Sequence, residues 1–91
     1  MRIDKFLKMA RLVKRRTVAQ EMIEVGAVRI DGRVCKPSAE VTEGKTVEIA
    51  YMARVLKVKV VCADELLLKR PQTVAYEVLE ERQVQSDEKP W

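Results

Sequence analysis

The sequence predicts an α+β fold, in which two short helices pack on a small, bent, mainly antiparallel sheet. Helical periodicity occurs near the N-terminus, an Asp-Gly dipeptide separates two short apolar runs, and apolar residues alternate with polar ones over much of the later chain. With 91 residues, the chain has the length of one small domain. We expect a core over residues 1–51, C-terminal strands over 52–85 that complete the same domain, and a flexible tail over 86–91.

The first predicted helix spans residues 3–10. Its apolar residues recur at the i, i+3, i+4 and i+7 spacing of an amphipathic helix, and the basic residues lie outside that stripe. Phe6 and Leu7 belong to the apolar stripe. We therefore expect them in the core and not among the residues that contact nucleic acid.

A second helix is predicted over residues 18–25. Thr17 and Gln20 have the spacing of a capping box, in which the hydroxyl and the amide satisfy backbone groups of the first helical turn. Gly26 follows the last residue of this helix and supplies the left-handed conformation in which many helices end.

Short strands are predicted on both sides of several turns. Asp31-Gly32 favours a type I′ turn and therefore a tight hairpin. The last apolar alternation, at Val74, Tyr76 and Val78, predicts a strand, whereas the helix-favouring residues over 74–83 leave a helix as the alternative. The predicted strands are residues 28–30, 33–35, 46–51, 54–62 and 74–79.

Positive charge is concentrated at the N-terminus. Residues 1–16 contain seven Lys or Arg and one acid, a net charge of +6, whereas the whole chain carries +4. Four of the six residues from Arg11 to Arg16 are basic, and they precede a predicted helix whose N-terminal backbone donors also attract anions. Clustered cations of this kind favour a polyanion such as nucleic acid. Arg29 and Arg33 flank the predicted hairpin turn and extend the predicted basic surface.

Enzymatic and metal-dependent functions have little support in the sequence. The chain has no histidine, and its two cysteines lie far apart, so we expect Cys35 and Cys62 to be reduced thiols and predict no metal or cofactor. Glu21 and Glu24 could form a carboxylate pair, but no nucleophile or cofactor loop accompanies them. We therefore do not expect an enzyme.

The sequence also bears on membrane contact and location. Residues 2–16 could form a basic helix on an anionic membrane, but the capped second helix and the hairpin indicate that its apolar face is buried inside a domain. No apolar segment is long enough to span a bilayer, and the N-terminus lacks the apolar stretch of a signal peptide. We expect a cytoplasmic protein.

Three segments together resemble the S4 RNA-binding domain. They are Arg2-Ile3-Asp4-Lys5-Phe6-Leu7, the basic run ending in Lys14-Arg15-Arg16-Thr17, and the hairpin around Asp31-Gly32, so that the resemblance covers residues 1–51. Among S4 proteins, the strings from Met1 to Lys8 and from Arg11 to Thr17 are most similar to the stand-alone RqcP family of bacterial ribosome quality control. That family is related to the small heat-shock S4 protein.

The resemblance implies a non-catalytic factor that binds 23S rRNA and peptidyl-tRNA on stalled large (50S) ribosomal subunits. It also implies support for C-terminal alanine tailing of nascent chains, with the tailing factor RqcH as a partner on the same particle and with this chain as a monomer. A heat-shock or ribosome-assembly protein that binds rRNA without a role in tailing is the alternative.

The resemblance also assigns roles to residues at matching positions. Arg2 and Arg16 become the leading RNA contacts, and Asp4 is expected to orient a nearby arginine instead of binding phosphate. We expect recognition through phosphate geometry and helix shape, with little base readout. The complete set of predicted RNA-binding residues is Arg2, Lys5, Arg11, Lys14, Arg15, Arg16, Thr17, Arg29 and Arg33, with Asp4 as the orienting residue.

Overall fold

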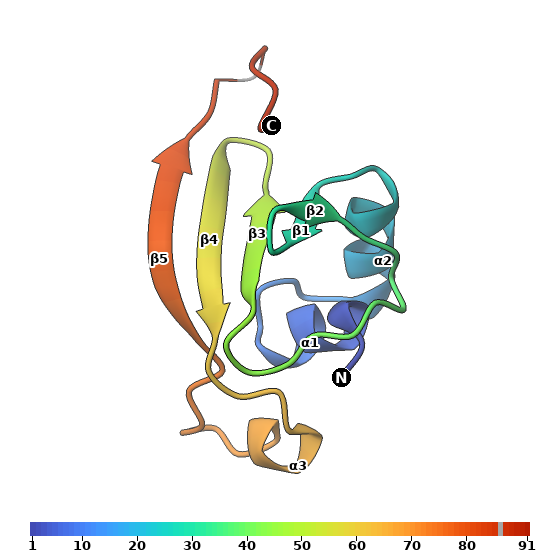
Figure 1. Ribbon diagram of the computed structural model, residues 1–91, viewed down its shortest axis with the longest axis vertical. Coiled ribbons are helices and arrows are strands. Elements are labelled where there is room, and N and C mark those ends of the chain that lie inside the picture. The colour runs from blue at the N-terminus through green and yellow to red at the C-terminus, as the bar shows by residue number, and fades with distance from the viewer. Residues whose placement is uncertain (86) are drawn as a thin grey trace.

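Two helices pack against one part of a five-stranded antiparallel sheet, which confirms the predicted fold class (Figure 1). The computed structural model describes residues 1–85 and 87–91. Within them, the strand order is β2-β1-β3-β4-β5 and every neighbouring pair is antiparallel. The elements are α1 (Ile3–Met9), α2 (Arg16–Glu24), β1 (Val28–Ile30), β2 (Arg33–Val34), β3 (Thr46–Ala50), β4 (Arg54–Val60), α3 (Glu65–Leu68) and β5 (Tyr76–Gln83).

The hydrophobic core lies between the two helices and the sheet. Phe6 and Leu7 are fully buried, which confirms their assignment to the core. Val58 of β4 is buried in the same cluster, whereas its neighbour Lys59 is exposed, as the alternation along this strand predicts. Each buried side chain of this size stabilises the fold by about 1.5–3 kcal/mol, so this cluster fixes the helices on the sheet.

Helix α1 ends in a Schellman motif with an arginine at the position where glycine is usual. The N–H of Arg11 donates to Lys8 O at 3.1 Å, and the N–H of Leu12 donates to Leu7 O at 3.0 Å. Arg11 has a φ of 62°, which is unfavourable for a residue with a Cβ atom. The chain thereby turns sharply out of α1 into a segment in which Leu12 and Val13 are buried and Lys14 and Arg15 are exposed.

Helix α2 begins earlier than predicted, and the predicted capping box is wrong. Arg15 is the N-cap with extended backbone and no side-chain cap, so Thr17 lies inside the first turn. The amide of Gln20 does not return to the helix start, because its Nε2 donates to Asp4 Oδ2 at 2.9 Å. The predicted helix end is correct, since Gly26 has a φ of 79° directly after the C-cap.

Replacing Thr17 by alanine is expected to change the free energy of unfolding by less than about 0.5 kcal/mol. The hydroxyl satisfies no backbone donor of α2, and alanine has the higher helix propensity. Chemical denaturation followed by circular dichroism measures the difference. A loss near 1 kcal/mol, the typical cost of a deleted cap, would contradict this placement of the helix start.

The first hairpin and the third strand agree with the prediction. Asp31 and Gly32 have φ values of 49° and 81°, as a type I′ turn requires at both central positions. The Asp31 carboxylate also accepts from the N–H of Thr46 at 3.0 Å, which ties the turn to the start of β3. Strand β1 then pairs with β3, and Val28 faces Ile49 in the register.

The second half contains the predicted last strand and a helix that was not predicted. β5 pairs with β4 along its length, so the strand prediction for this segment is confirmed and the helix alternative over 74–83 is wrong. The strand extends to Gln83, beyond the predicted end. The short helix α3 begins at an Asp64 cap, whose carboxylate accepts from Leu67 N at 3.1 Å. A single turn has no periodicity by which a sequence pattern could identify it.

The last residue of the predicted flexible tail, Trp91, contacts the domain. Ser86, the first residue of that predicted tail, lies outside the described residues. Trp91 Nε1 donates to Gly26 O at 2.9 Å, and the Arg29 guanidinium lies 4.3 Å from the centre of its ring. Both cysteines are free thiols, as predicted; burial raises the pKa of Cys35.

Candidate RNA-binding site

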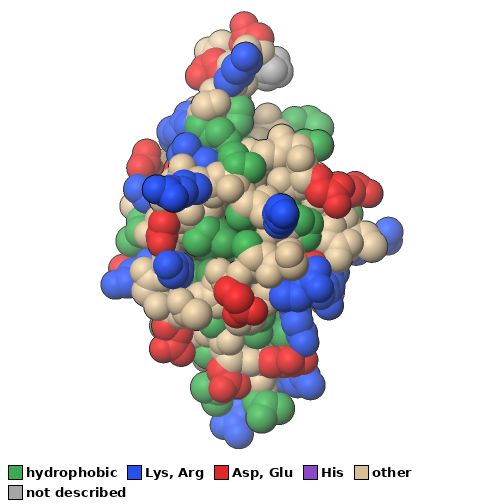
Figure 2. Space-filling model, turned by 45° about the vertical axis from the view of Figure 1, so that its right-hand side comes forward, with side chains coloured by type: hydrophobic (Ala, Val, Ile, Leu, Met, Phe, Trp, Pro, Cys, Tyr) green, Lys and Arg blue, Asp and Glu red, His purple; other side chains and the backbone are tan. Residues whose placement is uncertain are grey.

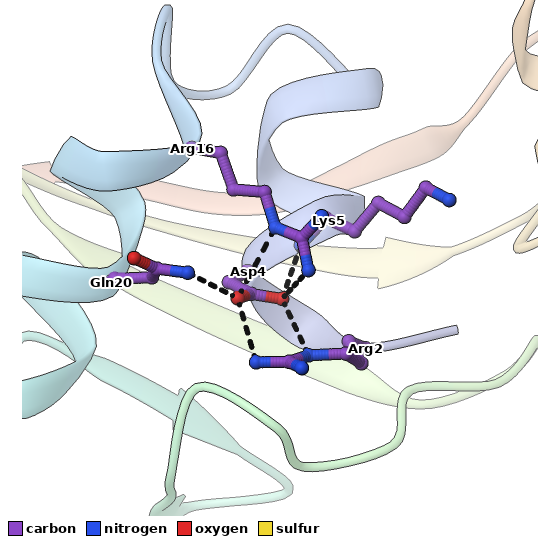
Figure 3. A network of polar contacts seen from close by, with 5 residues as sticks. All are labelled: Arg2, Asp4, Lys5, Arg16 and Gln20. Carbon is purple, nitrogen blue, oxygen red and sulfur yellow. Dashed lines mark hydrogen bonds and ion pairs between the residues drawn. The ribbon is translucent and has the colours of Figure 1, made fainter.

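Asp4 is the one charged side chain among the described residues that is fully buried, and it gathers donors from two helices (Figure 3). Arg2 donates through Nε and Nη2 to the two carboxylate oxygens at 3.2 and 3.1 Å. Arg16 Nη2 lies 3.5 Å from Oδ1, Gln20 Nε2 donates at 2.9 Å, and the Lys5 backbone N–H donates at 2.7 Å. We call Arg2, Asp4 and Arg16 the two-arginine site.

The backbone of Arg2 is fixed by the loop before β3. Arg2 and Glu40 form an isolated antiparallel bridge, and the N–H of Ile3 donates to Ala39 O at 2.8 Å. The Arg2 side chain is 46% exposed and uses two of its five N–H donors on Asp4. Three donors therefore remain for an external anion such as phosphate.

Arg16 reaches the same carboxylate from the start of α2. Its Nε lies 3.3 Å from Asp4 Oδ2, and its side chain is 42% exposed. A planar guanidinium held at one edge keeps its orientation and presents its other donors, which suits bidentate binding of phosphate. Asp4 thus holds two half-exposed guanidinium groups, one from the N-cap of α1 and one from the first residue of α2.

The Asp4 carboxylate is ionised in the folded protein. Burial raises its pKa, but hydrogen bonds from Gln20, Arg16 and the Lys5 backbone, together with the Arg16 charge, outweigh burial and lower the pKa below its ordinary value. The negative charge that orients the arginines is therefore retained throughout the physiological pH range.

The segment that leaves α1 presents three more predicted cations, and we call residues 11–15 the basic turn. Arg11, Lys14 and Arg15 are exposed, whereas the two residues between Arg11 and Lys14 are buried and anchor the turn. The Tyr51 hydroxyl donates to Leu12 O at 2.7 Å, which ties the turn to the end of β3. In the space-filling view of the helical side, Lys and Arg side chains gather in the lower right part of the surface, bordered by Asp and Glu side chains (Figure 2).

Lys5 is partly neutralised by an acid that the sequence did not associate with it. Its Nζ lies 2.7 Å from Glu65 Oε1, and the pairing lowers the pKa of Glu65. Glu65 belongs to α3 and lines the same surface hollow as Arg2, Lys5 and Arg16. The negative charge of Glu65 therefore lies next to cations that are predicted to bind RNA.

Replacing Glu65 by glutamine is expected to increase RNA affinity roughly threefold, since it frees Lys5 from an exposed ion pair. If Lys5 then contacts a phosphate, the slope of log affinity against log salt should steepen by about 0.7 to 0.9. The control is Glu80→Gln, which adds the same charge on β5. Equal gains for the two variants would show that net charge alone is responsible.

Of the two predicted hairpin residues, Arg29 is already partnered within the domain. Arg29 Nη2 lies 2.8 Å from Glu48 Oε2, and its guanidinium stacks on Trp91, so its charge is already partnered. Arg33 is exposed on β2. Thr17 is exposed in the first turn of α2, next to Arg16, and its role stays a prediction.

The outer face of the sheet carries charges of both signs in register. Arg29 of β1 lies beside Glu48 of β3, Glu48 beside Lys57 of β4, and Lys57 beside Glu80 of β5. Cross-strand neighbours of opposite charge attract one another, so this face offers no concentration of positive charge. This row of the sheet therefore adds little to the predicted RNA-binding surface.

Sequence reasoning missed three residues that shape the site. Gln20 bonds Asp4 instead of capping a helix, Tyr51 holds the basic turn, and Glu65 pairs with Lys5. The partners of Tyr51 and Glu65 are far away in the chain, so no local pattern indicates them.

Within the described residues, no helix has the length and apolar character needed to cross a bilayer.

Comparison with known proteins places the chain in a family. The S4 domain model matches residues 1–47. The RQC P-site tRNA stabilizing factor of Halalkalibacterium halodurans is 36% identical over 88 residues, which cover 97% of this chain and 100% of the relative. The factor of the same name from Streptococcus pneumoniae is 34% identical over 87 residues, covering 96% of this chain and 99% of the relative.

One relative matches a shorter stretch of the chain at higher identity. The RQC P-site tRNA stabilizing factor of Helicobacter pylori J99 is 50% identical over 52 residues, which cover 57% of this chain and 62% of the relative. The trimeric structure of Vibrio cholerae heat shock protein 15 is similar to this chain, with a TM-score of 0.74 and 24% sequence identity. The match covers 86% of this chain and 80% of that protein's chain, and at this identity it supports only the fold assignment. The chain thus belongs to the S4 domain family and, within it, to the family of RQC P-site tRNA stabilizing factors.

Proposed function

We propose that this protein is an RNA-binding factor of ribosome quality control that stabilises tRNA in the P site of the large ribosomal subunit. The observation that carries the proposal is the two-arginine site, in which one buried carboxylate fixes two half-exposed guanidinium groups. The name shared by relatives that align over nearly the whole chain supports the same function.

The chemistry of the site favours recognition of the RNA backbone. Guanidinium groups with free donors bind phosphate oxygens bidentately, and the exposed Lys14 and Arg15 add charge without a fixed geometry. A rigid pair of arginines selects phosphates at one spacing, which distinguishes folded RNA from a flexible strand. Binding of this kind lengthens the residence of tRNA on the subunit and needs no catalysis, so we infer a non-enzymatic role.

The finer assignment follows from the family resemblance. The RNA partners are 23S rRNA and peptidyl-tRNA on stalled 50S subunits, and the protein acts as a cytoplasmic monomer. It supports C-terminal alanine tailing by holding the tRNA while RqcH works on the same particle.

Sedimentation of cell lysate containing the tagged protein tests the proposal. Wild-type protein is expected to migrate with large subunits that carry peptidyl-tRNA, and Arg16→Ala is expected to remain near the top of the gradient. Lys59→Ala removes one charge from β4, away from the site, and should migrate as wild type does. Migration of the wild type with small subunits or polysomes would favour the ribosome-assembly alternative.

A further inference from the structure

A second hollow lies at the other end of α1 from the two-arginine site. It has a volume of about 320 Å³ and is bounded by the end of α1 and by the segment from α3 to β5. Pockets of this size accommodate small ligands such as a nucleotide. Its lining residues include Met9, Arg11, Leu68, Arg70, Val74 and Tyr76.

The backbone of Arg11 at the edge of this hollow is strained. Both long helices end in the same hydrogen-bonded motif, and the left-handed position is glycine in α2 but arginine in α1. Gly26 adopts its φ of 79° freely, whereas Arg11 at 62° does so against the preference of its Cβ atom. Strained positions of this kind occur most often where the side chain serves a ligand.

The hollow combines a few apolar side chains with cations that form no ion pair among the described residues. Arg11 and Arg70 are exposed, and neither takes part in an ion pair anywhere in residues 1–85 and 87–91. Met9, Leu68 and Val74 contribute apolar side chains to the lining. This combination matches a ligand with an anionic group and an apolar, flat group in close proximity.

We propose that the hollow receives an unpaired nucleotide of the RNA that the two-arginine site binds. The phosphate lies against Arg11 and Arg70, and the base stacks on Tyr76, which also lines the hollow. Arg11 begins the basic turn that leads to Arg16, so one RNA can contact both places. The inference rests on the proposed function and adds a preference for RNA in which a base is free to unstack.

Two RNA hairpins with the same stem provide the test, one fully paired and one with a single bulged 2-aminopurine nucleotide. Wild-type protein is expected to bind the bulged hairpin about tenfold more tightly and to quench the 2-aminopurine fluorescence by stacking. Arg70→Ala and Arg11→Gly should lose this preference and the quenching. Glycine retains the left-handed turn, so Arg11→Gly removes the guanidinium without disturbing the fold. Lys59→Ala is the control for the loss of one charge.

The outcomes separate this inference from the proposed function. If Arg70→Ala and Arg11→Gly bind both hairpins as Lys59→Ala does while Arg16→Ala weakens binding to both, the hollow is not a nucleotide site and the proposed function stands. If Arg16→Ala, with an unchanged thermal unfolding midpoint, also binds as Lys59→Ala does, both proposals fail. A bulge preference and quenching that depend on Arg11 and Arg70 would establish the site.

Discussion

Asp4→Asn is expected to lower the free energy of unfolding by about 2 kcal/mol at pH 7. Asparagine has nearly the same size, but its single carbonyl oxygen cannot replace two carboxylate oxygens that accept from Arg2, Gln20 and the Lys5 backbone. Its amide hydrogens also face the guanidinium donors. Because the two arginines are half-exposed, water compensates part of the loss, and the cost is below that of a fully buried ion pair.

The pH dependence of this difference identifies the carboxylate as its origin. The folded-state pKa of Asp4 is lowered, so its ionised form stabilises the protein above the unfolded-state pKa of about 3.9. That contribution is lost as the pH falls through the folded-state pKa. Wild type and Asp4→Asn should therefore begin to converge below about pH 4 and become equal only below the lowered folded-state pKa of Asp4, which urea denaturation across a pH series measures. The control Glu80→Gln changes an exposed acid, and a difference as large as that of Asp4→Asn would contradict the assignment.

Arg16→Ala is expected to weaken RNA binding by about tenfold or more at physiological salt. The guanidinium is already partly oriented by Asp4, so it loses less rotational freedom when it binds phosphate. Losing one phosphate contact should also reduce the slope of log affinity against log salt by about 0.7 to 0.9. Fluorescence anisotropy with a labelled structured RNA at several salt concentrations measures both quantities.

Two control variants separate orientation from charge at this position. Arg16→Lys keeps the charge but lacks the planar fork, and it should bind more weakly than wild type. Arg15→Ala removes the neighbouring exposed cation, which has no fixed partner, and should have the smaller effect. Equal losses for Arg15→Ala and Arg16→Ala would show that Asp4 contributes nothing to RNA binding through Arg16.

The features that could be predicted from the sequence are those with a local signal. The hairpin at Asp31-Gly32 and the helix end at Gly26 follow from the backbone preferences of single residues, and the structure has both. The predicted start of α2 failed because the polar groups of Gln20 have two possible partners, and the tertiary one, Asp4, is preferred. A capping pattern cannot reveal that competition, since Asp4 lies on the preceding helix.

The sequence indicates the basic residues of the candidate site but not the side chains with which they form ion pairs and hydrogen bonds. The basic run is visible as a charge excess, and family resemblance marks Arg2 and Arg16 as its leading residues. The acid that pairs with Lys5 lies on α3, and the acid that neutralises Arg29 lies on β3, so both are distant in the sequence from their partners. Pairing at such sequence distances is decided by the packing of the whole domain.

The alternating row formed by Arg29, Glu48, Lys57 and Glu80 has a consequence for how the molecule meets its partner. Opposite signs at short intervals cancel at a distance, whereas the unbalanced cations of the helical side do not. The protein therefore has a permanent electric polarity that rotates it during diffusion. A polyanionic partner is therefore expected to meet the helical side first.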